Sequence, residues 1–516
     1  MKAHLMYRDR DFDLGQEARP YEEALVADLE LPTLFAAMSR GDTWLTEVVR
    51  KALLASSVEV DTILYRQDIL KDCLRNEAAV REMYDLAVET IASVRKYYLG
   101  RLARYPGWVL HRSVEGMEML VDMLRRLRGL ADQHAAAFES EGFRALFAML
   151  RGELGDDYFA TVRHHLKQLK VHDRVFISAQ LGEGTKGASY TLRREKAREG
   201  GWLTRIFATG PPAYSFQLPD RDEGGSRALS ELRDRGINLV ANALAQSTEH
   251  IVSFFNMLRT ELAFYVGCLN LHGRLLVQGE PLCFPRPSVP AERRHSATGL
   301  YDVCLALKLG SRVIGNELQA DDKDLVIVTG ANQGGKSTFL RSIGLSQLMM
   351  QCGMFAPAQT FAANVCERIF THYRREEDVA MKSGKFDEEL SRMSSIIDGL
   401  VPNSLVLLNE SFAATNEREG SEIARQVVTA LIERHIKVVC VTHQYEFARR
   451  LYAEDVPGRL FLRAGRLPDG TRTFIVTQGQ PLETSYGEDL YRQIFADDDG
   501  AHRSSGSLTT RGAASK

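Results

Sequence analysis

The sequence contains few cysteines and no long hydrophobic run. Its seven cysteines are scattered over 516 residues, with no close pair and no spacing typical of a metal site. This distribution predicts reduced thiols in a cytosol and argues against a disulfide-stabilised secreted domain. No window holds the roughly 18 consecutive apolar residues of a membrane helix, and residues 1–10 lack the apolar core of a signal peptide. We therefore expect a cytoplasmic protein with no membrane partner.

The sequence also lacks an excess of charge of either sign. Its net charge of −3 gives no global attraction to nucleic acid, so any DNA contact must come from a local patch. A hydrophobic content of 44% and a charged content of 26% are typical of soluble globular proteins. A chain of 516 residues is too long for one hydrophobic core, so we expect about two to four domains.

Residues 1–280 are predicted to be mainly helical. Apolar residues recur at helical spacing between Val114 and Ala131, and a longer pattern of this kind runs from Leu229 to Leu271 without a proline. At 1.5 Å per residue, a helix of about 40 residues spans about 60 Å. Such a helix is longer than a compact domain needs and is suited to a lever or strut.

A small β-containing insert is expected at residues 171–220, inside this helical region. Residues 175–177 and 188–192 resemble strands with glycine-rich turns. A basic stretch with Trp202 follows, which is suited to contact a DNA backbone. An ordinary solvated loop is the alternative. The candidate DNA-binding residues are Lys186, Arg193, Arg194, Lys196 and Arg198.

Composition divides the rest of the chain. Prolines crowd residues 281–299, which we interpret as a linker between the helical region and a nucleotide-binding domain at residues 300–496. Residues 497–516 have almost no large apolar side chain, so they are expected to form a disordered tail.

The most specific motif is a phosphate-binding loop at residues 330–337, which matches G-x-x-x-x-G-K-[ST]. It follows a short apolar run typical of a buried strand at residues 325–328 and precedes a predicted helix at residues 338–350. Lys336 would reach the β- and γ-phosphates of a nucleotide, and the Ser337 hydroxyl would bind Mg²⁺. The predicted nucleotide-binding residues here are Gly330, Ala331, Asn332, Gln333, Gly334, Gly335, Lys336, Ser337 and Thr338.

Two further buried-strand patterns end in polar residues. Residues 404–408 are followed by Asn409 and Glu410, and residues 438–441 by Thr442 and His443. Because a parallel sheet gathers its ligand chemistry at the carboxyl ends of its strands, these residues should meet at the phosphate-binding loop. With Lys336, we therefore predict Glu410 and His443 as catalytic residues: Glu410 activates the attacking water and His443 senses the γ-phosphate.

The predicted metal residues are Ser337, Asn409 and Glu410, because oxygen ligands at these positions suit Mg²⁺. For His443, an ordinary residue at a strand end is the alternative to a functional role. Thr415 and Asn416 begin a predicted helix that runs through Arg434 and could meet a phosphate there. By itself that feature is also an ordinary capped helix end.

Together these motifs resemble the MutS family. Residues 329–341 look like its P-loop, and Phe386 to Glu389 is similar to its F-x-x-E segment. Residues 402–408, the Thr415 region, Thr442-His443 and the Ser-Tyr-Gly at residues 485–487 follow in the family's order and spacing. The resemblance covers about residues 300–495, and it extends more weakly upstream to residues 62–70 and to the long helix after Leu229.

The resemblance implies a multidomain α plus α/β protein: a mainly helical core and lever region with its small insert, followed by an ABC-type P-loop ATPase domain. It implies ATP and Mg²⁺ as cofactors, dimerisation through the ATPase domains, and an active site completed by the partner's segment around Thr415 and Asn416. It also implies double-stranded, mismatched or branched DNA as a binding partner, along with repair proteins. The segment near Val313 and Ile314 is our choice for the adenine contact.

Three departures from the family pattern qualify these expectations. Asn409 stands where the family has an aspartate, so weaker Mg²⁺ binding and slow hydrolysis are expected. Residues 412–416 replace a glycine-rich signature and are closer to the MutS subfamily linked to a Smr nuclease. Neither an N-terminal mismatch-reading domain nor a Smr domain is expected in this chain. The predicted function is ATP-controlled DNA binding in mismatch repair or a related process. The alternative is an ATP-gated protein–protein switch with little DNA affinity.

Overall fold

The computed structural model describes residues 1–15, 21–98, 106–170, 177–181, 187–192, 223–375 and 384–483. It divides into two compact units. The first contains Met1–Ala3, Ala78–Glu139 and Phe143–Glu261; the second contains His4–Glu77, Ser140–Gly142 and the chain from Leu262 onward. The predicted boundary at residue 280 is therefore wrong for the N-terminal segment, because residues 4–77 pack in the unit that contains the phosphate-binding loop motif.

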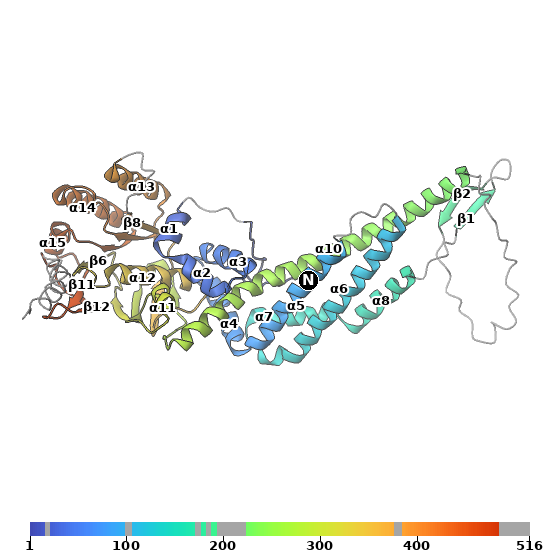
Figure 1. Cartoon of the computed structure of the whole chain (residues 1–516), viewed down its shortest axis with the longest axis horizontal. Helices are drawn as coiled ribbons and strands as arrows, with labels where there is room; N and C mark the ends of the chain where they lie inside the picture. Colours follow the sequence, from blue (N-terminus) through green and yellow to red (C-terminus); the bar gives the residue numbers. More distant parts are fainter. Residues whose placement is uncertain are drawn as a thin grey trace, which may run out of the picture. The chain divides into compact units, whose positions relative to one another are not determined.

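The first unit is built mainly from helices (Figure 1). Within the part that the structure describes, these are α5 (Glu77–Tyr98), α6 (Pro106–His134), η1 (Ala135–Ala137), α7 (Glu141–Glu153), α8 (Asp156–Lys170) and most of α10 (Glu223–Val277). Helix α6 packs against α8, and the rings of Phe138, Phe143 and Phe147 form an aromatic cluster. The two helices predicted from apolar spacing are confirmed, and α10 is longer at both ends than its pattern indicated.

The predicted insert contains a β-hairpin. Strands β1 (Ile177–Leu181) and β2 (Gly187–Leu192) pair antiparallel. Strand β2 confirms the prediction for residues 188–192, whereas β1 shares only Ile177 with the predicted strand at 175–177, and residues 175 and 176 lie outside the described residues. The candidate DNA-binding residues Lys186, Arg193, Arg194, Lys196 and Arg198 lie outside the described residues, as do the Ser-Tyr-Gly segment at 485–487 and the predicted tail at 497–516.

The second unit holds two sheets. The larger one has six strands in the order β12-β11-β6-β10-β9-β8. Its five strands from β11 to β8 run parallel, and β12 pairs antiparallel with β11. These strands are β6 (Leu325–Gly330), β8 (Ile369–Tyr373), β9 (Leu405–Asn409), β10 (Lys437–Val441), β11 (Arg459–Arg466) and β12 (Arg472–Gln478).

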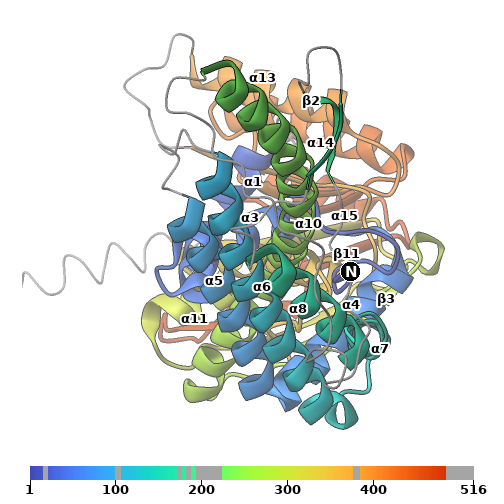
Figure 2. The same ribbon diagram turned by 90° about the vertical axis from the view of Figure 1, so that its right-hand side faces the viewer.

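Helices cover both faces of the larger sheet (Figures 1 and 2). On one face, Ile327, Val406 and Val438 share a core with α13 (Lys385–Gly399), α14 (Glu417–Glu433) and α15 (Tyr445–Ala453). On the other lies α12 (Lys336–Gln351), where a Cβ added at Gly344 would come within 2.6 Å of Leu407. This double coverage explains why β6 and β9 are apolar along almost their whole length.

The smaller sheet has the order β3-β7-β4-β5. Its strands are β3 (Arg286–Ser288), β4 (His295–Leu300), β5 (Asn316–Gln319) and β7 (Thr360–Asn364), with η3 (Pro290–Glu292) between the first two. The segment 281–299, predicted as a linker, is therefore part of the folded unit. Strand β3 tolerates Pro287 because it lies at the sheet edge, where an N–H is not needed on the open side.

The N-terminal helices of the second unit are α1 (Glu22–Asp28), α2 (Leu31–Ser39), α3 (Thr43–Leu54) and α4 (Val60–Arg75). Leu31 and Leu34 of α2 are fully buried, and α2 packs against α11 (Val303–Leu309). Helix α1 packs against β8. Apolar burial of this kind accounts for the position of residues 4–77 in the second unit. Among the described residues, no helix is long and apolar enough to cross a membrane.

Candidate functional site

The phosphate-binding loop has the backbone that its sequence predicted. Strand β6 ends at Gly330, which has φ +108°, and α12 begins at Lys336 directly after Gly335, which has φ +87°. Gln333 also lies in the left-handed region, with φ 57°. At Gly334 a Cβ would come within 2.9 Å of the Ala331 carbonyl oxygen. The glycines are thus required by the curl of the loop.

Lys336 lies buried under this loop. Its Nζ donates hydrogen bonds to the carbonyl oxygens of Gly330 at 3.1 Å and Ala331 at 2.9 Å. Burial lowers the pKa of Lys336 to about 8, although the Glu410 carboxylate acts in the opposite direction. A phosphate at the loop would supply the anion that this buried ammonium lacks at contact distance, so the residues fit a nucleotide phosphate.

Two of the three predicted metal residues, Ser337 in the first turn of α12 and Asn409 at the end of β9, are in contact. The Ser337 hydroxyl donates a hydrogen bond to Asn409 Oδ1 at 3.0 Å. Both atoms are oxygens, the element that Mg²⁺ prefers. No group of three or more His, Cys, Asp or Glu residues suited to a metal occurs in the described part of the chain. A magnesium ion here would therefore take most of its ligands from phosphate and water, as is usual for this ion in ATPases.

Glu410 and His443 lie together at the same sheet edge. His443 Nε2 and Glu410 Oε1 are 2.7 Å apart. Burial raises the pKa of Glu410, but the hydrogen bond from His443 and the charges of His443, Lys336 and Arg374 outweigh burial and lower it overall. The carboxylate is thus ionised at neutral pH, as a base that activates water must be. The backbone at Glu410 is left-handed, with φ 54°, a conformation that often marks functional sites.

Thr415 and Asn416 lie at the start of α14, as predicted. Each has a partner within its own helix: Asn416 Oδ1 accepts from the Glu419 N–H at 3.0 Å, and the Thr415 hydroxyl donates to Glu419 Oε2 at 2.9 Å. Asn416 therefore caps α14, and Thr415 adds a side-chain hydrogen bond to its first turn. Within this single chain, they are held by their own helix rather than by contacts with the phosphate-binding loop.

Two buried residues support the loop that joins β9 to α14, and the sequence interpretation did not include them. Gln444 donates from Nε2 to the Phe412 carbonyl at 2.9 Å, and so links the residue after His443 to that loop. His372 Nδ1 lies 2.7 Å from Ser411 Oγ, and His372 Nε2 lies 3.1 Å from the Glu389 carbonyl oxygen. His372 is the penultimate residue of β8, and Gln444 precedes α15 three residues after β10; a polar residue near the carboxyl end of a strand is the signal that could have identified them.

Three other residues border the site without having been predicted. The Arg374 N–H donates to the Asn409 carbonyl at 3.0 Å, and its positive charge lowers the pKa of Glu410. Arg472 Nε donates to the Asn332 carbonyl at 3.0 Å. A Cβ at Gly335 would lie 3.5 Å from the Phe474 ring. Arg472 and Phe474 belong to β12, so only the pairing of β12 with β11 brings them near the loop.

The segment chosen for the adenine contact lies close to β12. Ile314 is 50% exposed, and the Val313 N–H donates to Glu280 Oε1 at 2.8 Å. Two residues later, Asn316 donates from Nδ2 to the Phe474 carbonyl at 3.1 Å. Asn316 Oδ1 also accepts the Val476 N–H at 2.7 Å, so two hydrogen bonds tie the residue that follows the chosen segment by two positions to the backbone of β12.

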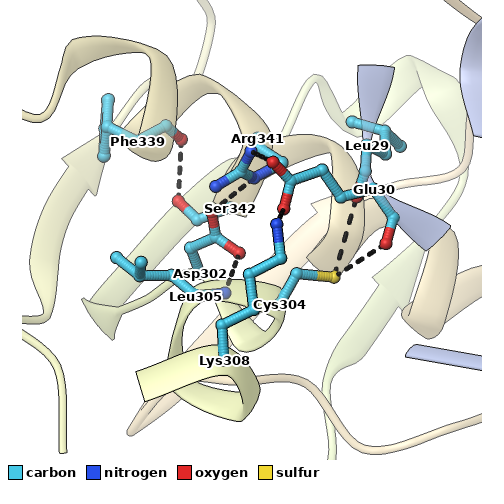
Figure 3. A network of polar contacts seen from close by, with 9 residues as sticks. All are labelled: Leu29, Glu30, Asp302, Cys304, Leu305, Lys308, Phe339, Arg341 and Ser342. Carbon is cyan, nitrogen blue, oxygen red and sulfur yellow. Dashed lines mark hydrogen bonds and ion pairs between the residues drawn. The ribbon is translucent and has the colours of Figure 1, made fainter. Parts of the chain in front are cut away.

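A polar network anchors the helix that follows the loop (Figure 3). Arg341, on α12, forms ion pairs with Glu30 Oε1 at 2.6 Å and with Asp302 Oδ2 at 2.5 Å. Asp302 is fully buried in its side chain and caps α11 by accepting the Leu305 N–H. Lys308 forms a further ion pair with Glu30. Helix α12 is therefore tied to α11 and to the junction between α1 and α2.

Comparison with protein families identifies both parts of the chain. Residues 58–277 match the model of the MutS2 N-terminal domain, and residues 326–469 match that of MutS domain V. The second match contains the phosphate-binding loop, Asn409, Glu410, the Thr415 region and His443. Together the two matches cover well over half of the chain.

Several relatives of this chain are named DNA mismatch repair protein MutS. That of Lactococcus lactis subsp. lactis is 25% identical over 421 residues, which is 76% of this chain and 47% of the relative. That of Syntrophomonas wolfei subsp. wolfei is 34% identical over 182 residues, or 34% of this chain and 21% of the relative. That of Thermotoga neapolitana is 35% identical over 164 residues, which is 32% of this chain and 20% of the relative. The chain thus spans about half the length of these relatives or less.

Proposed function

This chain belongs to the MutS family, and from that premise we propose that it is an ATPase that uses ATP binding and slow hydrolysis to control its grip on DNA, in mismatch repair or a related repair or recombination process. One observation carries the proposal: three groups of residues lie at the same edge of a parallel sheet. They are the loop lysine Lys336, the Ser337–Asn409 contact and the Glu410–His443 pair. That arrangement suits phosphoryl transfer to water.

In this proposal the chain's own residues divide the work. The loop N–H groups and Lys336 hold the β- and γ-phosphates, and Ser337 and Asn409 face the bound magnesium, which neutralises phosphate charge when it is present. Glu410 orients a water molecule and accepts its proton, while His443 holds the Glu410 carboxylate in place. ATP and Mg²⁺ are thus the proposed cofactors.

The proposed assembly is a homodimer through ABC-type ATPase domains. Thr415 and Asn416 of one protomer would then face the nucleotide bound by its partner. They lie at the amino-terminal end of α14, and the N–H groups at such a helix end can bind a phosphate. The start of this helix also carries Glu417 and Glu419 in its first turn, so its charge is less favourable to phosphate than that of an uncharged helix end.

A protein–protein switch with little DNA affinity is the second candidate. The net charge of −3 favours it, since a basic surface is the usual electrostatic mark of a DNA-binding domain. The basic residues at 186–205 favour DNA. Neutralising Arg193, Arg194, Lys196 and Arg198 together separates the two candidates: loss of DNA binding with a flatter salt dependence supports the first.

The proposed function is tested by the ATPase rate with no DNA and with homoduplex, mismatched or branched DNA, at two salt concentrations. We expect one DNA form to change the rate, with a smaller effect at high salt. The Lys336→Ala variant is the nucleotide-binding control and should lose about 10- to 150-fold in ATP affinity, as expected for a lost charge-assisted contact. ATP binding without a response to any DNA would favour the switch.

Replacing Asn409 with aspartate should raise the ATPase rate and tighten Mg²⁺ binding. An added carboxylate next to the ion contributes more than 1 kcal/mol even at a high effective dielectric constant, so the Mg²⁺ concentration for half-maximal effect should fall about tenfold or more. Mg²⁺ titrations of the rate and of fluorescent ADP binding both report this. Asn403→Asp, at the opposite sheet edge, is the matched control. An unchanged rate and Mg²⁺ dependence in Asn409→Asp would contradict the role given to position 409.

A further inference from the structure

A cavity lies at the opposite edge of the larger sheet from the phosphate-binding loop. Its volume is about 470 Å³, within the range of small-molecule sites. Asp324, Ser404 and Lys437 line it, and these residues lie at the amino-terminal ends of β6, β9 and β10. The nucleotide residues come from the carboxyl ends of the same strands. The cavity is therefore separate from the proposed ATPase site.

The lining is cationic on one side. Arg293, Lys323 and Lys437 face the cavity together with a single carboxylate, that of Asp324. Two of the three cations have close partners: Arg293 forms an ion pair with Asp324, and Lys323 Nζ donates to the Pro457 carbonyl at 2.6 Å. The polar side also contains Asn403, whose amide can donate to an anion.

Lys437 is a cation of this lining that forms no ion pair with a described residue. Its Nζ makes one long hydrogen bond, 3.4 Å to the Ala320 carbonyl, and it has no ion pair with any residue in the described part of the chain. An ammonium group carries three N–H donors, so two remain for a ligand. Burying an ammonium with no carboxylate in contact is costly, and the charges of Asp324 and Asp321 compensate only in part, because burial still lowers the pKa of Lys437. The arrangement is that of a site prepared for an anion.

The other side of the cavity is apolar. Val289, Pro290 and Ala291 line it, and Val289 is 50% exposed. A single phosphate or carboxylate group would fill only part of the volume, which leaves space for an uncharged body against these residues. We propose that this cavity binds a small amphipathic anion, with its phosphate or carboxylate group at Lys437 and its uncharged body over residues 289–291.

The proposal predicts a pH dependence of binding. Burial lowers the pKa of Lys437 to about 8, so the free ammonium loses its proton as the pH rises through 8. An anion stabilises the charged form, so its affinity should be higher at pH 7 than at pH 9. Burial lowers the pKa of His295 well below its usual value and raises that of Cys366 to about 12, so neither changes charge in this interval. The other charged or titratable groups around Lys437 are Arg293, Asp321, Lys323, Asp324 and His435.

The test uses the full chain with Mg-ADP in the nucleotide site, or the Lys336→Ala variant, so that the phosphate-binding loop does not bind the probe. Calorimetric titrations compare phenyl phosphate, benzoate, inorganic phosphate and uncharged phenol. We expect phenyl phosphate or benzoate to bind more tightly than inorganic phosphate, and phenol not to bind. Comparison of the first two distinguishes a phosphate from a carboxylate ligand.

Lys437→Gln should weaken binding about 10- to 150-fold. Arg434→Gln, a neighbouring cation outside the cavity lining, should leave binding unchanged. If Lys437→Gln does not fold, the wild-type protein still decides: crystals soaked in selenate should show an anomalous peak within hydrogen-bond distance of Lys437 Nζ. The proposal would be overturned if the folded Lys437→Gln variant bound the anionic probes as tightly as the unsubstituted protein. It would also be overturned if the unsubstituted protein showed no selenate peak and bound none of the anionic probes.

Discussion

Replacing Glu410 with glutamine is expected to reduce ATP hydrolysis by about 10²- to 10⁴-fold, the usual contribution of a positioned general base. The substitution keeps the size of the side chain and removes the proton acceptor. His443 can still donate from Nε2 to the amide oxygen, across the 2.7 Å contact that it now makes with the carboxylate. The loop that holds the phosphates is not altered, so ATP affinity should change little. Single-turnover hydrolysis and equilibrium ATP binding, measured on the same preparation, check both expectations.

The matched control is Glu433→Gln, which removes an exposed carboxylate from the last residue of α14 without touching the Glu410–His443 pair. Its hydrolysis rate should remain within a few-fold of the unsubstituted protein. Hydrolysis by Glu410→Gln at the rate of this control would show that another group activates the water. A parallel loss of ATP binding would show that Glu410 acts on the ground state, through its effect on Lys336.

The parts of the site that the sequence predicted are those that local pattern and strand topology determine. The phosphate-binding loop lies between an apolar strand and a helix, and its glycines adopt the positive φ values that such a loop needs. Asn409 and His443 each follow a buried strand, and parallel strands bring such ends to one edge. The contact of Ser337 with Asn409 joins residues 72 positions apart, yet this rule anticipates it.

The parts that were missed depend on pairings that no local pattern contains. Segment 281–299 was predicted as a linker because of its prolines, but β3 pairs with β7, whose residues are about 75 positions further along. Phe474 and Arg472 reach the loop only because β12 folds back on β11. The packing of residues 4–77 within the second unit includes apolar contacts between α2 and α11, which are far apart in the sequence.

Replacing Arg341 with alanine is expected to destabilise the second unit by about 3–5 kcal/mol, the usual cost of removing one partner from a buried ion pair. Arg341 is 16% exposed, and its partner Asp302 is fully buried, so Asp302 would retain a carboxylate with no cation in contact. Equilibrium unfolding in denaturant, followed by circular dichroism, measures the loss. The free energy of unfolding should fall without a change in ATP-binding stoichiometry in the protein that remains folded.

This variant should also acquire a pH dependence with a defined sign. Burial already raises the pKa of Asp302, and the Arg341 charge opposes that rise. Without Arg341, the pKa of Asp302 in the folded state should rise further above its pKa in the unfolded state. At a pH between these two pKa values, the folded protein binds more protons than the unfolded chain. The free energy of unfolding therefore falls as the pH increases through this interval. The variant should thus be less destabilised in mild acid than at neutral pH.

A double substitution distinguishes the contribution of the Arg341–Asp302 ion pair to stability from the other contributions of Arg341. Asp302→Asn removes the buried charge, and an asparagine at this position can still accept the Leu305 N–H that caps α11. In the Arg341→Ala background it should restore much of the lost stability and abolish the new pH dependence. If the losses in unfolding free energy of the two single variants simply add in the double variant, Arg341 stabilises the unit by packing or through Glu30 alone. Rescue by Asp302→Asn would instead establish that α12, the helix that begins at Lys336, is held to α11 by this charge pair.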